Sequence, residues 1–103
     1  MPVDPTTKRV MRGTVLKLTY QKHERQEHRF RDETLLIALD QLSFNVHLDL
    51  VRELIQDLGD RDYLKFNSTR NRKTGEMVIS EIQLTPDGRD LVERIRTDQA
   101  VEV

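Results

Sequence analysis

The feature that most constrains the fold is a change of apolar pattern at Gly59. Before it, five apolar residues recur on one side of a helix that turns about 100° per residue: Leu50, Val51, Leu54, Ile55 and Leu58. After it, residues 63–67 and 77–84 are rich in β-branched and aromatic residues, which is typical of strands. We therefore predict a helix over about 46–58, capped by Asn45 and stopped by a left-handed Gly59, and then a β-hairpin.

Two helices are expected ahead of this one. Residues 8–24 carry a blurred helical stripe with Gly13 as a weak point, and Thr6 or Thr7 can cap it. Residues 24–31 form either a helix extension or a connection. Asp32 then precedes a dense apolar group that predicts a short buried helix, with the Asp32 carboxylate as its cap.

A last helix is expected to follow the hairpin. Thr85 and Pro86 form an N-cap and a first-turn proline, and the helix should run to about residue 96 with Leu91, Val92 and Ile95 on its inward side. A chain of 103 residues fits one core. We predict a flexible arm over 1–5, one domain over 6–96 and a tail over 97–103.

Composition argues against several classes of protein. The chain has no cysteine, no apolar run of membrane-spanning length and no export signal, so we expect a cytoplasmic protein without disulfides. It has no nucleophile elbow or phosphate loop, and we expect neither an enzyme nor a cofactor. His23 and His28 are spaced i and i+5, which does not suit zinc. His47 is expected to be partly buried and hydrogen-bonded rather than a ligand.

The formal net charge of −1 hides a segregation of charge along the chain. Residues 1–31 hold eight Lys/Arg against three Asp/Glu, and residues 32–62 hold two against eight. Residues 63–75 hold four against none, and residues 76–103 hold three against seven. Two basic segments can present a basic face to a polyanion even when the sum is acidic.

Two motifs carry a resemblance to a known family. Residues 58–64 read LGDRDYL, and residues 84–93 read LTPDGRDLVE. Together with the expected order of helix, helix, helix, hairpin and helix, they make residues 12–96 similar to the winged helix-turn-helix superfamily of prokaryotic regulators, and to small winged-helix proteins of bacteriophages and prophages. The resemblance implies an α+β winged helix: a three-helix bundle with a β-hairpin wing and a C-terminal helix.

The resemblance further implies that the protein binds double-stranded DNA and regulates transcription. The third helix would lie in the major groove and the wing on the phosphate backbone. The residues expected to face bases are Asn45, Asp49, Arg52 and Gln56. The residues expected on phosphates are Lys8, Arg9, Arg12, Arg70, Arg72 and Lys73. Four to six phosphate contacts would give a salt slope of roughly −4 to −5.

Other interpretations stay open beside this one. A basic hairpin tip also serves to keep exposed strands from aggregating. The polar face of the third helix presents two acids, Asp49 and Glu53, and one base, Arg52, and residues 32–62 carry a net charge of −6. The alternative interpretation is therefore a winged-helix module whose acidic third helix contacts another protein. A homodimer is expected under either interpretation, through the first helix or through the last helix with residues 97–103.

Overall fold

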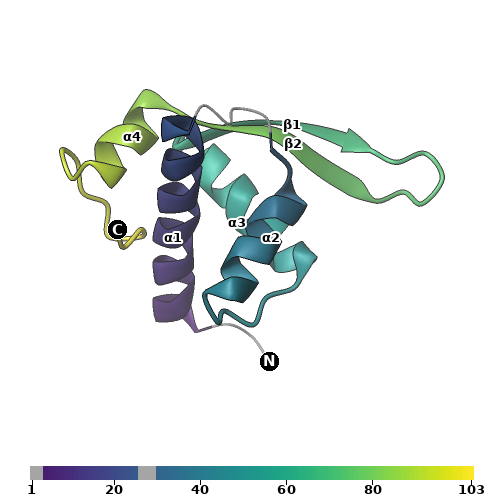
Figure 1. Cartoon of the computed structure of the whole chain (residues 1–103), viewed down its shortest axis with the longest axis horizontal. Coiled ribbons are helices and arrows are strands. Elements are labelled where there is room, and N and C mark those ends of the chain that lie inside the picture. The colour runs from purple at the N-terminus through teal and green to yellow at the C-terminus, as the bar shows by residue number, and fades with distance from the viewer. Residues whose placement is uncertain (1–3, 26–29) are drawn as a thin grey trace.

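The computed structural model describes residues 4–25 and 30–103 and has an α+β fold. In chain order its elements are α1 (Pro5–Glu24), α2 (Asp32–Gln41), α3 (Leu48–Asp60), β1 (Leu64–Arg70), β2 (Met77–Leu84) and α4 (Pro86–Val92). In Figure 1 α1 stands between α4 on one side and the α2–α3 pair on the other, and the hairpin runs across one end of the helices. This order agrees with the predicted one and is compatible with a winged-helix architecture.

The core lies between the helices and the inner face of the hairpin. Its fully enclosed side chains come from the four helices and β2, and the largest are Leu16, Leu35, Leu39, Leu54, Ile55, Leu58, Ile79, Ile82 and Leu91. In a regular strand Ile79 and Ile82 would point to opposite faces. A bulge places Glu81 and Ile82 opposite the single residue Phe66, with Glu81 at φ 52°, and this restores both isoleucines to the core.

The start of α1 differs from the prediction. The helix begins at Pro5, and the Asp4 side chain accepts a hydrogen bond from the Thr6 amide at 2.9 Å, so Asp4 is the cap rather than Thr6 or Thr7. A proline at the first helical position has no amide to satisfy, which favours a helix start there. Residues 1–3 of the predicted arm and 26–29 of the predicted connection lie outside the described residues.

The boundaries of α3 also differ. Asn45 is not its cap: His47, which is exposed rather than partly buried, is the N-cap residue and makes no side-chain cap bond. Gly59 lies within the helix, and the left-handed residue that ends it is Asp62, at φ 66°. Gly59 serves a different purpose, because a Cβ there would lie 2.6 Å from the Phe66 ring.

The last helix is shorter than predicted, although its cap is confirmed. The Thr85 hydroxyl accepts a hydrogen bond from the Gly88 amide at 3.0 Å, with Pro86 in the first turn. The helix ends at Val92 because Arg94 adopts a left-handed φ of 63°, and Ile95 is 73% exposed rather than inward. None of the helices in the described part of the chain has the length and apolar character needed to cross a bilayer.

Residues 97–103 pack back across α1. The Glu102 amide donates to the Arg9 carbonyl at 3.1 Å, and Val101 is buried. Gly13 permits this contact, since a Cβ there would lie 1.7 Å from the Glu102 carbonyl oxygen. The two surfaces expected to mediate a dimer, α1 and the C-terminal segment, therefore partly cover one another within one chain, as Figure 1 shows.

Candidate nucleic-acid interface

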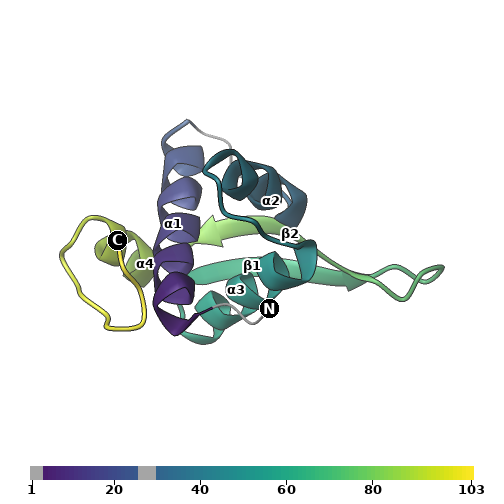
Figure 2. The same ribbon diagram turned by 90° about the horizontal axis from the view of Figure 1, so that it is seen from below.

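The hairpin tip is an ordered turn built around Asn71. The Asn71 amide donates to the Glu76 carbonyl at 2.8 Å, and its carbonyl accepts from the Gly75 amide at 2.7 Å. The Asn71 side chain also accepts from the Lys73 amide at 2.8 Å. Gly75, at φ 72°, supplies the left-handed backbone that closes the turn. The tip therefore holds its side chains in a defined loop that projects beyond the helices (Figures 1 and 2).

Three cations occupy this loop and the strand end beside it: Arg70, Arg72 and Lys73, which we call the basic tip. All three are exposed, and within the described residues their side chains make no hydrogen bond or ion pair. A guanidinium or ammonium group in that state is fully hydrated and is available to a polyanion. The structure thus brings these three predicted residues together.

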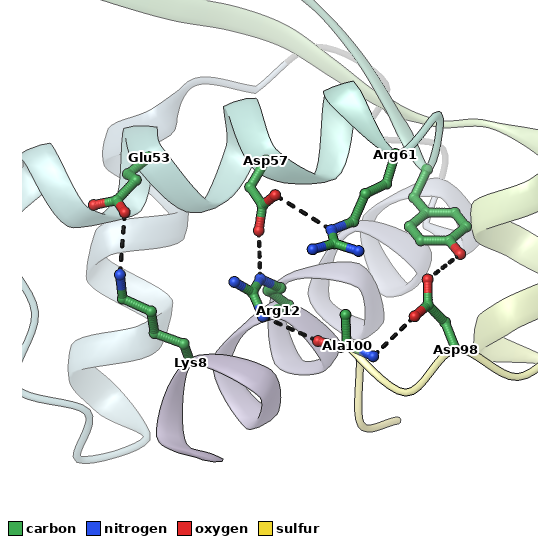
Figure 3. A network of polar contacts seen from close by, with 8 residues as sticks. Lys8, Arg12, Glu53, Asp57, Arg61, Asp98 and Ala100 are labelled. Carbon is green, nitrogen blue, oxygen red and sulfur yellow. Dashed lines mark hydrogen bonds and ion pairs between the residues drawn. The ribbon is translucent and has the colours of Figure 1, made fainter. Parts of the chain in front are cut away.

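Two of the three N-terminal cations, Lys8 and Arg12, are instead bound to acceptors within the fold (Figure 3). The Lys8 ammonium pairs with Glu53 of α3 at 3.1 Å. Arg12 donates to Asp57 of α3 and, at 3.1 Å, to the Ala100 carbonyl. The Asp57 carboxylate also accepts from the Arg61 Nε at 3.2 Å, so it lies between two guanidinium groups. The predicted phosphate contacts Lys8 and Arg12 join α1 to α3.

Arg9 is the least constrained of the N-terminal cations. Its guanidinium lies 4.0 Å from the Glu102 carboxylate, and both side chains are about half exposed. An exposed pair at this distance contributes little to stability. Arg9 is therefore accessible, and it lies on α1 beside the C-terminal segment.

The exposed side of α3 is acidic. Residues at helical spacing along it are Asp49, Glu53, Gln56 and Asp60, which we call the α3 ridge, and all four are exposed. Lys8 meets one of its three carboxylates. Asn45 is exposed in the segment before α3, and the Gln56 amide donates to the Met77 sulfur at 3.3 Å. Of the residues expected to face bases, Asn45, Asp49 and Gln56 are thus at the surface.

Arg52, the fourth of these residues, lies inside the molecule. Its Nε donates to Asp32 at 2.7 Å and its Nη1 donates to Glu76 at 3.0 Å. Burial opposes the charge of this side chain, but the hydrogen bonds to Asp32 and Glu76 raise the pKa of Arg52 above its ordinary value. Two groups of the Arg52 side chain are thus bound to carboxylates and the side chain is only 11% exposed, so within the fold Arg52 has an internal role that the sequence did not predict.

Asp32 is the centre of that internal network and not a helix cap. Arg31 is the N-cap residue of α2, without a side-chain bond, and Asp32 is fully buried. Its carboxylate accepts from Arg52, from the Glu33 amide at 2.8 Å and from the Ile79 amide of β2 at 3.1 Å. The carboxylate therefore joins α2, α3 and the hairpin.

Of the two histidines with the i and i+5 spacing, the structure describes one. The His23 ring accepts a bond from the Leu84 amide at 3.4 Å, while His28 lies outside the described residues. Residues 4–25 and 30–103 contain no group of three or more His, Asp or Glu side chains placed to hold an ion.

Comparison of the chain with models of protein families, with curated proteins and with solved structures gives no match. The proposals that follow therefore rest on the residues and their geometry.

Proposed function

We propose that this protein is a winged-helix DNA-binding protein that holds duplex DNA by its phosphate backbone through the basic tip. The observation that carries the proposal is the contrast in pairing. Arg70, Arg72 and Lys73 are exposed and unpaired within the described residues, whereas Lys8, Arg12 and Arg52 bind carboxylates. Unpaired cations on a projecting loop are the groups that release counterions from DNA.

The charge of the α3 ridge shapes this proposal. Three carboxylates facing a major groove would repel the flanking phosphates, so α3 contributes little affinity. Sequence readout, which transcription regulation requires, would then depend on Asn45 and Gln56, the uncharged polar side chains at that surface. We expect binding that is weakly selective and dominated by the hairpin.

Fluorescence anisotropy with two short fluorescein-labelled duplexes of unrelated sequence tests the proposal. Three phosphate contacts predict a slope of about −2.7 for log K against log salt, and hence roughly a 40-fold loss of affinity between 50 and 200 mM salt. Both duplexes should bind in the micromolar range at low salt and show that slope. Absence of binding to either duplex at low salt contradicts the proposal.

A second function, a winged-helix module that binds another protein, is favoured by one specific observation. The α3 ridge is exposed and acidic, and the one arginine expected on it is buried with Asp32 and Glu76. Such a surface suits a basic protein partner better than a phosphate backbone. The same titration separates the two candidates, because a protein module of this kind has no requirement for duplex binding at low salt.

A further inference from the structure

The hairpin is attached to α3 by contacts from successive turns of that helix. Arg52 bonds to Glu76 at 3.0 Å, the Gln56 amide reaches the Met77 sulfur at 3.3 Å, and Gly59 lies against the Phe66 ring. The Arg52 contact is the one nearest the tip loop. It is also the only one of the three that joins two charged groups.

Arg52 is itself held in place by a second contact. Its Nε is bound to Asp32, which is fully buried and is fixed by two backbone amides, those of Glu33 and Ile79. A planar guanidinium with one edge fixed presents its remaining donors in a set direction. That direction leads to Glu76, whose side chain is 53% exposed at the surface.

Glu76 closes the tip loop. Its carbonyl accepts from the Asn71 amide at 2.8 Å, its amide donates to the Thr74 hydroxyl at 3.2 Å, and Met77 begins β2 immediately after it. The loop between Asn71 and Glu76 is bonded internally, so it moves as a unit. Fixing the Glu76 side chain against α3 therefore fixes the direction in which Arg72 and Lys73 project.

We propose that Arg52 is a positioning residue for DNA binding, which acts through Glu76 to hold the basic tip in one orientation relative to α3. This inference rests on the proposed function. In that orientation the tip cations are presented to phosphates in advance, and binding does not have to order the loop. The contact also places the Glu76 carboxylate beside the basic tip. The proposal can therefore be tested by whether removal of Glu76 raises or lowers the affinity for duplex.

The test compares Glu76→Ala with Glu81→Ala. Each variant removes one exposed carboxylate from the hairpin. Glu81 accepts from Asn67, however, and among the described residues the hydrogen bonds of the Arg52 side chain go to Asp32 and Glu76. Simple electrostatics predicts that both variants bind duplex more tightly, by roughly twofold, because a repulsive charge is lost. We expect Glu81→Ala to follow that rule and Glu76→Ala to bind roughly three- to tenfold more weakly, because the loop is no longer held in advance.

An increase in affinity for Glu76→Ala equal to that of Glu81→Ala overturns the proposal. Arg52→Ala is not suited to this test, since it leaves the buried Asp32 carboxylate without its partner and can prevent folding. Glu76 is half exposed, and its removal leaves the buried Arg52–Asp32 pair in place.

A measurement without DNA separates this inference from the proposed function. The chain has no cysteine, so spin labels at Lys17→Cys on α1 and Arg72→Cys in the tip, both exposed, report one distance distribution. We expect a narrow distribution that Glu76→Ala broadens and Glu81→Ala leaves narrow. Equal widths in all three proteins overturn the positioning role. If Glu76→Ala broadens the distribution and the chain does not bind duplex, the positioning role of the Arg52–Glu76 contact is supported and only the proposed function is rejected.

Discussion

Lys8, Arg9 and Arg12 on α1 and Arg70, Arg72 and Lys73 on the hairpin are equally basic triplets in the sequence, yet the fold treats them differently. The first triplet faces α3 and the C-terminal segment. There its side-chain nitrogens lie 4.0 Å or less from carboxylate oxygens of Glu53, Asp57 and Glu102. The second triplet lies on a loop that carries no acid before Glu76, and that carboxylate is occupied by Arg52.

The number of cations in a segment therefore does not show whether that segment can bind a polyanion. A cation contributes to polyanion binding when its counterions in the free protein are small ions rather than fixed carboxylates. By that criterion Lys8 and Arg12 of the first triplet stabilise the fold, Arg9 contributes little, and the hairpin triplet is available to bind a polyanion. The following variants sharpen or break this distinction, in order of expected effect.

Arg52→Ala should have the largest effect, because Arg52 is the most deeply paired cation of those described above. Its loss leaves the fully buried Asp32 carboxylate without a charged partner. We expect the free energy of unfolding, measured by urea titration, to fall by about 3–5 kcal/mol. A loss below about 1 kcal/mol would class the pair with exposed ion pairs and contradict its internal role.

Gly13→Ala tests how much the packing of the C-terminal segment against α1 contributes to stability. The new Cβ would stand 1.7 Å from the Glu102 carbonyl oxygen, and that backbone has to move. We expect a loss of about 1–3 kcal/mol in unfolding free energy and faster hydrogen exchange at the Glu102 amide. Lys17→Ala, at an exposed position of the same helix, is the control and should change neither quantity.

Arg12→Ala and Arg72→Ala test the distinction with one residue from each triplet. The Arg12 side chain is 18% exposed and serves two acceptors, so its loss should cost about 1–2 kcal/mol of unfolding free energy and leave duplex affinity unchanged. Arg72 has no partner within the described residues, so its loss should change stability by less than about 0.5 kcal/mol. It should also reduce the salt slope by about 0.9. The reverse pairing of effects would break the distinction.

The smallest effect concerns pH. Hydrogen bonds from the Tyr63 hydroxyl and the Ala100 amide lower the pKa of Asp98, so its stabilisation is complete above the unfolded pKa of about 3.9 and disappears as the pH falls through the folded value. Burial and the bond to Asp98 raise the pKa of Tyr63, so that contribution is complete below the unfolded pKa of about 10 and is lost as the pH rises through the folded value. The stability gap between wild type and Asp98→Asn should therefore narrow below about pH 4 and nowhere between pH 5 and 9. A gap that stays constant down to pH 3 would contradict this account.

The sequence predicted the elements well because their signals are local. The periodic apolar residues of α3, the strand-like run 77–84 and the Thr85–Pro86 cap each depend on neighbours within one or two turns. The C-terminal ends of α3 and α4 were predicted less well, because the left-handed residues that end them are Asp62 and Arg94 rather than a glycine.

The candidate site was predicted only in part. The basic tip could be read from residues 70–73, since a loop that joins two strands is exposed. The burial of Arg52 could not be predicted from the sequence, because its partners Asp32 and Glu76 lie 20 and 24 residues away in the chain. On a helical projection Arg52 borders the apolar side of α3, and that position alone does not distinguish a surface arginine from one that binds a buried carboxylate.

Duplex titration of two matched triple variants tests the central claim most directly. Arg70, Arg72 and Lys73 are changed together to alanine in one protein, and Lys8, Arg9 and Arg12 in the other, so that each loses three cations. We predict that the hairpin variant loses the low-salt binding and its slope, while the α1 variant keeps the slope of about −2.7 and becomes less stable. Equal losses of affinity in the two variants would contradict the account, since net charge alone would then explain binding.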